Sequence, residues 1–145
     1  MAFENNMALL KFPVHRENNR TPESRQKAKE FGVLGEQMAT RYLEDNGYII
    51  LARNYHKGHQ EADIIALDND ELVIVEVKTR SNTAWFAPEE AVNHQKRLNL
   101  IKVANNYVHK HHRSESVRFD IIAITSNGKD TQIKHIKNAF NVMQF

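Results

Sequence analysis

The stretch Glu61–Lys78, EADIIALDNDELVIVEVK, decides the fold predicted for this 145-residue chain. Two runs rich in β-branched residues flank the polar segment DNDE, which is typical of two strands joined by a tight turn. If Asn69 and Asp70 form a two-residue loop, the numbers of every cross-strand pair add to the same value. That register places Asp63 directly opposite Glu76.

Directly opposed residues of an antiparallel pair share one face, with Cβ atoms roughly 4.5–5.5 Å apart. We therefore expect the carboxylates of Asp63 and Glu76 to meet. Lys78 is expected on the same face, about 7 Å beyond Glu76 along the strand. A shift of one residue would put the two acids on opposite faces, so the register tests this prediction.

Two adjacent carboxylates beside a lysine are suited to holding a hard divalent cation. Buried carboxylates repel one another unless a cation lies between them or one takes a proton. Oxygen ligands favour Mg²⁺ or Mn²⁺, which commonly take one or two carboxylates and complete their shell with water and phosphate. The expected chemistry is hydrolysis of a phosphodiester, with Lys78 orienting water or neutralising developing charge. The alternative is that Asp63, Glu76 and Lys78 form a structural ion-pair cluster.

The composition excludes several classes of protein. The chain has no cysteine, which rules out disulfides and thiolate metal sites. No apolar run approaches the roughly 20 residues of a membrane span, so we expect a cytoplasmic protein with no membrane partner. The net charge is only +2, but no acidic residue occurs between Ala91 and Ser114. The cations of that segment, Lys96, Arg97 and Lys102 among them, predict a basic helix that attracts phosphate, or simply a solvated helix face.

The remaining pattern predicts an α/β fold with a mixed central sheet flanked by helices. The third strand, from Leu72, has apolar residues on both faces and is expected at the centre. Residues 1–21 are predicted to form a flexible arm, and residues 22–145 a single domain. The other expected elements are a helix over 23–45 capped by Thr21 and broken near Gly32 and Gly35, a strand from 48, a helix over 89–111, strands over 117–125 and 132–137, and a tail over 138–145.

The spacing of Asp63, twelve residues, and then Glu76-Val77-Lys78 resembles the PD-(D/E)xK nuclease superfamily. A longer set of segments resembles the YraN-like family of small bacterial proteins over about residues 30–140. These segments are Gly35-Glu36, Gly47–Tyr55, Glu61-Ala62-Asp63, Val75–Arg80, Pro88–Val92, Lys96 and Arg118-Phe119-Asp120. The resemblance implies a restriction-endonuclease-like fold, similar to that of archaeal Holliday-junction resolvases.

The resemblance also implies the roles of individual residues. Asp63 and Glu76 would be metal ligands, Lys78 the catalytic lysine, and Glu36 an additional acid from the first helix. The family pattern usually has Gly-Glu-Ile-Asp where this chain has Gln-Glu-Ala-Asp before and at Asp63. In the assumed register Glu61 lies opposite Lys78, which predicts a cross-strand salt bridge.

The implied substrate is DNA, with branched or recombination structures as candidates. The residues expected to contact nucleic acid are Arg80, Gln95, Lys96, Arg97 and Lys102. Two further possibilities stay open: a nuclease-fold module that binds nucleic acid or a DNA-processing partner without cutting, and a structural protein with no nucleic-acid role. The sequence also leaves open a homodimer that would cut two strands.

Overall fold

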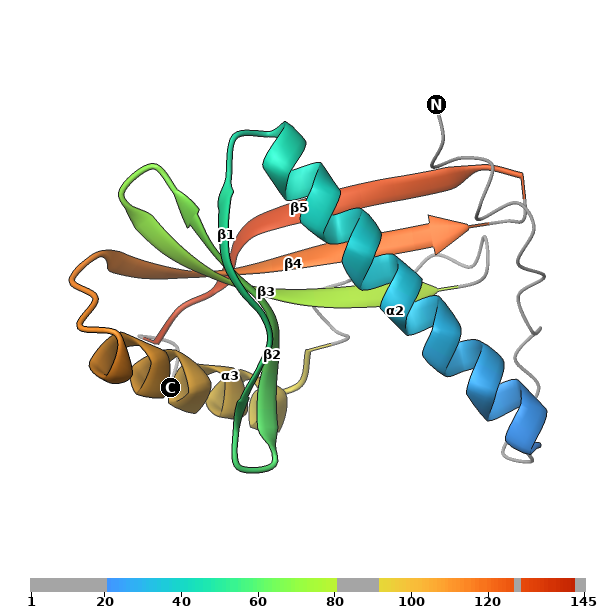
Figure 1. Ribbon diagram of the computed structural model, residues 1–145, viewed down its shortest axis with the longest axis horizontal. Coiled ribbons are helices and arrows are strands. Elements are labelled where there is room, and N and C mark those ends of the chain that lie inside the picture. Colours follow the sequence, from blue (N-terminus) through green and yellow to red (C-terminus); the bar gives the residue numbers. More distant parts are fainter. Residues whose placement is uncertain (1–20, 81–91, 127–128, 143–145) are drawn as a thin grey trace.

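The computed structural model describes residues 21–80, 92–126 and 129–142. Within them a five-stranded sheet, ordered β1-β2-β3-β4-β5, is accompanied by helices α2 and α3 (Figure 1). Because β3 pairs antiparallel with β2 and parallel with β4, the sheet is mixed. The predicted α/β fold, with a nuclease-like mixed sheet flanked by helices, is confirmed. The elements are α2 (Pro22–Asp45), β1 (Ile49–Lys57), β2 (Gln60–Asp68), β3 (Glu71–Arg80), α3 (His94–Lys110), β4 (Ser116–Ser126) and β5 (Thr131–Phe140).

Strands β2 and β3 form the predicted hairpin in the predicted register. Asp68 pairs with Glu71 around a two-residue loop, and Ile64 pairs with Val75. Asn69 has a φ of 53°, in the left-handed region that such loops require at their first position. The register on which the proposed meeting of the two acids depends is therefore confirmed.

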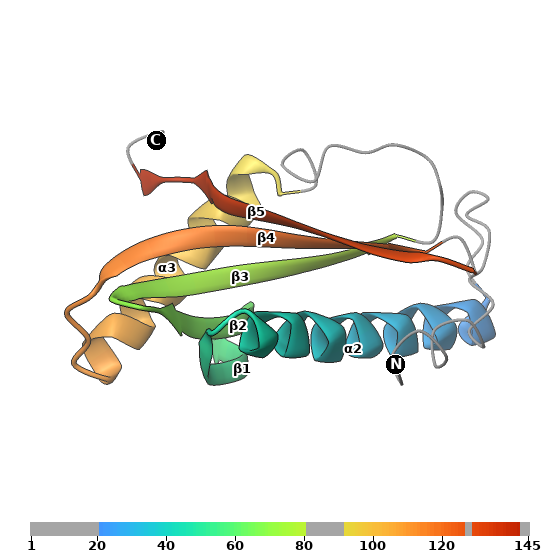
Figure 2. The same ribbon diagram turned by 90° about the horizontal axis from the view of Figure 1, so that it is seen from above.

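Strand β3 is the central strand and is covered on both faces. Val73 and Val75 belong to a core cluster that includes residues of α2, whereas Leu72 and Ile74 belong to a second cluster with residues of α3. Figure 2 shows α2 lying along one side of β3, β4 and β5. Two apolar faces on one strand are expected where helices cover both sides of a sheet.

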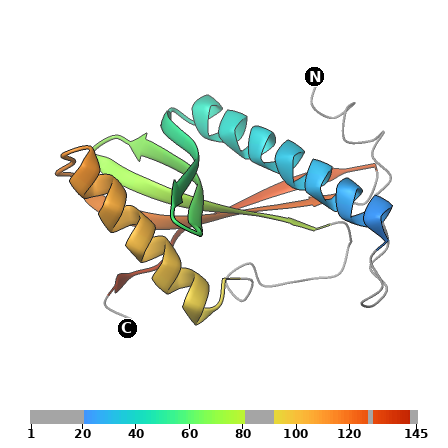
Figure 3. The same cartoon turned by 60° about the horizontal axis from the view of Figure 1, so that its bottom comes forward.

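Strand β2 separates from β3 beyond the Ile64–Val75 pair. The paired residues of β2 and β3 end there, whereas β3 continues beside β4 as far as the Arg80–Thr125 pair. The β1–β2 hairpin projects away from the rest of the sheet toward α3 (Figures 1 and 3). We call this point of separation, which Asp63 occupies, the fork.

Side-chain hydrogen bonds hold the projecting hairpin on α3. Gln60 Nε2 donates to Asn99 Oδ1 over 3.1 Å, and the Tyr55 hydroxyl donates to Asn106 Oδ1 over 2.7 Å. The hairpin is thus fixed at its tip and in its middle, which keeps the fork open on one side of β3.

Three predictions about the continuity or the ends of elements were wrong. Helix α2 is continuous and is not broken at its glycines. Helix α3 begins at His94, because Asn93 has an extended backbone and its side chain caps the helix by accepting the Lys96 N–H. Strand β5 continues to Phe140, which stacks on Phe119 with ring centroids 4.8 Å apart, so the predicted tail was wrong for residues 138–140. Residues 1–20 of the predicted arm over 1–21, and residues 89–91 of the predicted helix over 89–111, lie outside the described residues.

Each helix packs one apolar face on the sheet. The buried residues of α3 are Leu100, Val103, Ala104 and Tyr107, and the partly buried Ile101 and Val108 pack beside them. Helix α2 buries Phe31, Gly35, Met38, Ala39 and Leu43 against the other face of the sheet. Neither described helix carries an apolar stretch long enough to cross a bilayer.

Gly35 allows α2 to approach the end of β3. A Cβ atom at this position would lie 2.2 Å from Thr79 Cγ2, far inside van der Waals contact. The close contact lies next to Lys78 on β3, and Glu36 follows Gly35 on the helix. The missing side chain therefore sets where α2 presents Glu36.

We expect Gly35→Ala to lower the free energy of unfolding by about 1–3 kcal/mol, because the added methyl group overpacks the contact with Thr79. Urea denaturation measures the change. Gly32→Ala is the matched control, since nothing lies within 4 Å of its added Cβ. It should stabilise the protein by up to about 1 kcal/mol through helix propensity.

Adding Thr79→Ala to the Gly35→Ala variant should recover part of the loss, because the clashing methyl group is then absent. Equal stabilities of Gly35→Ala and Gly32→Ala would show that the helix and strand do not need this approach.

Candidate functional site

Asp63 lies at the fork, where β2 no longer pairs with β3. Its Oδ2 accepts the Val77 N–H over 2.8 Å, so the carboxylate satisfies a β3 amide that faces the fork. The side chain is buried. This hydrogen bond fixes the Asp63 carboxylate against β3 through Oδ2. The other carboxylate oxygen, Oδ1, does not take part in it.

Glu76 lies on β3 in the same register and is only 4% exposed. Its Oε1 is 3.4 Å from the Lys78 Nζ and 3.4 Å from the Lys96 Nζ. Its Oε2 is buried and has no hydrogen-bond partner. Two ammonium groups thus lie close to Glu76 Oε1, while Oε2 can still accept a hydrogen bond or bind a cation.

The pKa values of the acids are raised at the fork. Burial, with the charge of Asp63 next, raises the pKa of Glu76 to about 7, against the opposing charges of Lys96 and Lys78. Burial also raises the pKa of Asp63, although the Val77 N–H and the charge of Lys96 act the other way. Such a site favours a proton or a cation between the acids.

Helix α2 brings Glu36 toward the same site. Burial raises the pKa of Glu36 and the negative charge of Asp63 adds to the rise, while a hydrogen bond from the Asn54 side chain opposes it. Asn54 has a φ of 49°, an uncommon conformation for a non-glycine residue of a strand. Glu36 lies in the interior of α2, well beyond its first turn.

The residues predicted to contact nucleic acid fall into different settings. Lys96 joins Asp63, Glu76 and Lys78 at the fork, and we call these four residues the fork cluster. Gln95 and Lys102 are exposed on α3, where Gln95 donates to Asn99 Oδ1 over 3.0 Å, and Arg80 is exposed at the end of β3. Arg97 is held by the core, because its Nε donates to the Val92 carbonyl over 2.9 Å and its guanidinium lies 5.5 Å from the centre of the Phe140 ring.

The predicted salt bridge between Glu61 and Lys78 was wrong. Glu61 pairs instead with His56, with 3.4 Å between Oε2 and Nε2. The reason is the fork: beyond it β2 no longer runs opposite β3, so residues that would face one another in a continued ladder are apart. Lys78 pairs with Glu76 of its own strand instead.

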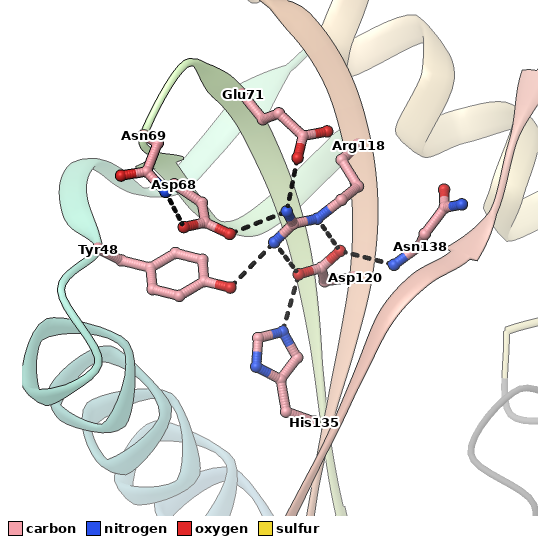
Figure 4. A network of polar contacts seen from close by, with 8 residues as sticks. All are labelled: Tyr48, Asp68, Asn69, Glu71, Arg118, Asp120, His135 and Asn138. Carbon is pink, nitrogen blue, oxygen red and sulfur yellow. Dashed lines mark hydrogen bonds and ion pairs between the residues drawn. The ribbon is translucent and has the colours of Figure 1, made fainter.

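A second polar cluster, the Arg118 network, lies at the start of β3 and β4 (Figure 4). The buried guanidinium of Arg118 donates five hydrogen bonds of 2.9–3.0 Å, and Asp120 accepts two of them. The other acceptors are Asp68, Glu71 and the Tyr48 hydroxyl. Asp120 also lies 2.7 Å from His135 Nε2 and accepts the Asn138 N–H over 3.0 Å.

The pKa values of Asp68 and Asp120 in this network shift in the opposite direction from those of the acids at the fork. Hydrogen bonding to Arg118 lowers the pKa of Asp68. Burial acts to raise the pKa of Asp120, but hydrogen bonds from His135 and Arg118 more than offset it and lower the pKa. Their partners thus favour the ionised forms of Asp68 and Asp120, as in a structural cluster. Sequence reasoning gave Arg118 and Asp120 no role, although charged residues two apart in an apolar strand were the available signal.

The donors at the fork fit a hard divalent cation. Among the described residues, no three His, Asp or Glu side chains come close enough to hold a metal by themselves. Mg²⁺ commonly binds through one or two carboxylates and keeps water or phosphate in its other positions. The unpartnered Oε2 of Glu76, beside the carboxylate of Asp63, is the acceptor that such an ion would satisfy. Asp63 and Glu76 would be the residues that hold it.

Fold and site together define the class of the molecule as an α/β protein with a nuclease-like mixed sheet flanked by helices. The chain belongs to the uncharacterised protein family UPF0102, whose profile matches residues 35–124. The predicted membership of the YraN-like family is thereby confirmed. The matched segment contains every residue of the fork cluster as well as Arg118 and Asp120, whereas His135 lies beyond it.

Several curated relatives are similar over most of their length. A UPF0102 protein of Bacteroides thetaiotaomicron is 48% identical over 111 residues, covering 77% of this chain and 92% of the relative. One from Persephonella marina is 45% identical over 112 residues, covering 77% and 93%. One from Alkaliphilus oremlandii is 43% identical over 115 residues, covering 77% and 98%.

We expect the stability of the metal-free protein to depend on pH through Glu76. Because its pKa is raised on folding, the folded state holds this proton more tightly than the unfolded state does. The resulting stability is present at low pH and is lost as the pH rises through about 7. Relative to wild type, Glu76→Gln should therefore gain about 2–3 kcal/mol between pH 5 and pH 8. Urea denaturation at both pH values, with exposed Glu44→Gln as control, measures the gain, and an equal effect at both values would contradict it.

We expect Arg118→Gln to lower the free energy of unfolding by about 3–5 kcal/mol, because it leaves the carboxylates of Asp68, Glu71 and Asp120 facing one another without their cation. The exposed control Arg25→Gln should stay within about 0.5 kcal/mol of wild type. A cost for Arg118→Gln close to that of the control in urea denaturation would show that the network does not hold the strands together.

Proposed function

We propose that this protein is a nuclease that hydrolyses DNA phosphodiester bonds with Mg²⁺ or Mn²⁺, with branched structures among its candidate substrates. The observation that carries the proposal is the cluster at the fork. There Asp63, Glu76 and Lys78 meet on neighbouring strands, the pKa values of both acids are raised, and one buried carboxylate oxygen has no partner. Perturbed acids of this kind favour a functional site over a structural one.

Each residue has a distinct part in the proposed reaction. Asp63, held by the Val77 N–H, and Glu76, through its free Oε2, would bind the ion. When bound, a divalent ion supplies positive charge for the phosphate and a water of lowered pKa. The Lys78 ammonium, next to Glu76, donates hydrogen bonds to the attacking water or to a phosphate oxygen as negative charge develops there. Glu36, presented by α2 near the charge of Asp63, would be an additional acid of the site.

The surface of α3 supplies the contacts for the nucleic acid. Gln95 and Lys102 are exposed on the helix that carries Lys96 into the cluster, and Arg80 is exposed at the end of β3. Positive side chains beside the site draw in the phosphate backbone without reading its sequence.

A second candidate function is a nuclease-fold module that binds nucleic acid without cutting. The observation that favours it is the pair of ammonium groups on Glu76 Oε1, which offsets the carboxylate charge with no metal. Such a module would bind DNA with an affinity that falls as salt rises and is indifferent to a chelator.

We expect Asp63→Asn, Glu76→Gln and Lys78→Ala each to retain the fold and to lower the cleavage rate by at least 10²–10³. The assay incubates linear, single-stranded and four-way DNA with Mg²⁺ or Mn²⁺, with a chelator as the blank. Lys134→Ala, an exposed lysine of β5, is the control and should cleave at the wild-type rate.

Cleavage near the wild-type rate by all three variants would remove these residues from the reaction. Chelator-independent DNA binding with no cleavage of any substrate would favour the non-cutting module instead.

A further inference from the structure

Lys96 reaches the fork cluster from α3, on a different element from the other cluster residues. Its Nζ lies 3.4 Å from Glu76 Oε1, the same distance as that of the Lys78 Nζ. The Lys96 side chain is 30% exposed, whereas that of Glu76 is 5% exposed. The ammonium therefore stands between a buried carboxylate and solvent.

The two lysines differ in how freely they can leave Glu76. Lys78 is two residues from Glu76 on β3, which at this point pairs with Ala123 of β4, so the Lys78 backbone follows the sheet. Lys96 extends from the first turn of a helix on a flexible four-carbon stem. Lys96 is the lysine that is attached outside the sheet, so its side chain can turn from the carboxylate toward the surface of α3.

An ammonium on Glu76 Oε1 and a divalent cation on Glu76 Oε2 would each neutralise the same carboxylate. An ion held by Asp63 and Glu76 would lie beside the Lys96 charge, and like charges at close range in a buried site repel strongly. The Lys96 ammonium must then be displaced or weaken the binding of the ion. Once displaced, it lies at the edge of the site with no acidic neighbour on its own helix.

We propose that Lys96 takes the place of the metal on Glu76 in the metal-free protein, and that metal binding releases it to contact the substrate phosphate. This inference rests on the proposed function, because it needs a divalent ion at the fork. It makes Lys96 a positioning residue for the carboxylates in one state and a substrate-binding residue in the other.

The test is isothermal titration calorimetry with Mn²⁺ on the full chain. Lys96→Met removes the competing charge, so we expect Mn²⁺ to bind at least about tenfold more tightly than to wild type. Lys110→Met is the matched control, since it removes an exposed lysine from the far end of the same helix, and its Mn²⁺ affinity should equal that of wild type. Lys96→Arg, which restores the charge, should return the affinity toward the wild-type value.

A second measurement, the affinity for DNA, tests whether the released Lys96 contacts the substrate, and it does not depend on cleavage. Mn²⁺ should raise the affinity of wild type for a short DNA duplex of phosphorothioate linkages more than it raises that of Lys96→Met. Circular dichroism confirms that each variant is folded, and Lys96→Gln replaces Lys96→Met if the latter is not.

The outcomes separate this inference from the proposed function. An affinity for Mn²⁺ in Lys96→Met and Lys96→Gln no tighter than that of Lys110→Met overturns the inference and leaves the nuclease proposal standing. Tighter binding in these variants, with no DNA cleavage by wild type, upholds the exchange of lysine for metal and removes the nuclease. Absence of any Mn²⁺ binding by wild type removes both.

Discussion

The hydrogen bond from the Val77 amide to Asp63 Oδ2, 2.8 Å long, joins β2 to β3 just beyond the point where their ladder ends. In a continuous sheet that amide would bond to a carbonyl group of β2. Here an ionisable side chain takes the carbonyl's place, so a carboxylate is drawn into the edge of the core. The other parts of the candidate site depend on this exchange, because the opposed Glu76 then shares a buried position with a second acid.

The acidic side chains at the two ends of β3 differ in how completely they are paired. At its start, Glu71 joins the Arg118 network, in which each carboxylate has a cation or a hydrogen-bond donor and the pKa values of Asp68 and Asp120 are lowered. Near its far end, Glu76 retains an oxygen without a partner and its pKa is raised. A fully satisfied cluster stabilises the fold, while an incompletely satisfied one has capacity left for a ligand. The contrast within one strand distinguishes framework from candidate site.

Sequence reasoning succeeded where the decisive interactions are local. The Asn69-Asp70 loop sets the register of the hairpin by itself, and the register brings Asp63 to Glu76. It failed where contacts between distant segments decide. The fork parts Glu61 from Lys78, the Phe119–Phe140 stack extends β5, and the fit of Gly35 against Thr79 positions α2. None of these contacts leaves a periodic signal. The Arg118 network was missed because its members come from four strands and the segment before β1, so the spacing of Arg118 and Asp120 in β4 does not reveal their partners.

At the fork the lysine side chains are more exposed to solvent than the acids, and this difference affects how an anionic substrate would approach. Lys78 and Lys96 are 25% and 30% exposed, whereas the acids behind them are nearly buried. A phosphate approaching the fork therefore meets ammonium groups before carboxylates, and the low-dielectric surroundings strengthen that attraction relative to water. With the lysines outermost, the acids can be held ready for a cation without repelling the phosphate. Helices α2 and α3, packed on opposite faces of β3, both contribute to this arrangement: one supplies Glu36 and the other Lys96. In the part of the chain that the structure describes, the covered sheet thus leaves Asp63 and Glu76 to be approached where β2 departs from β3.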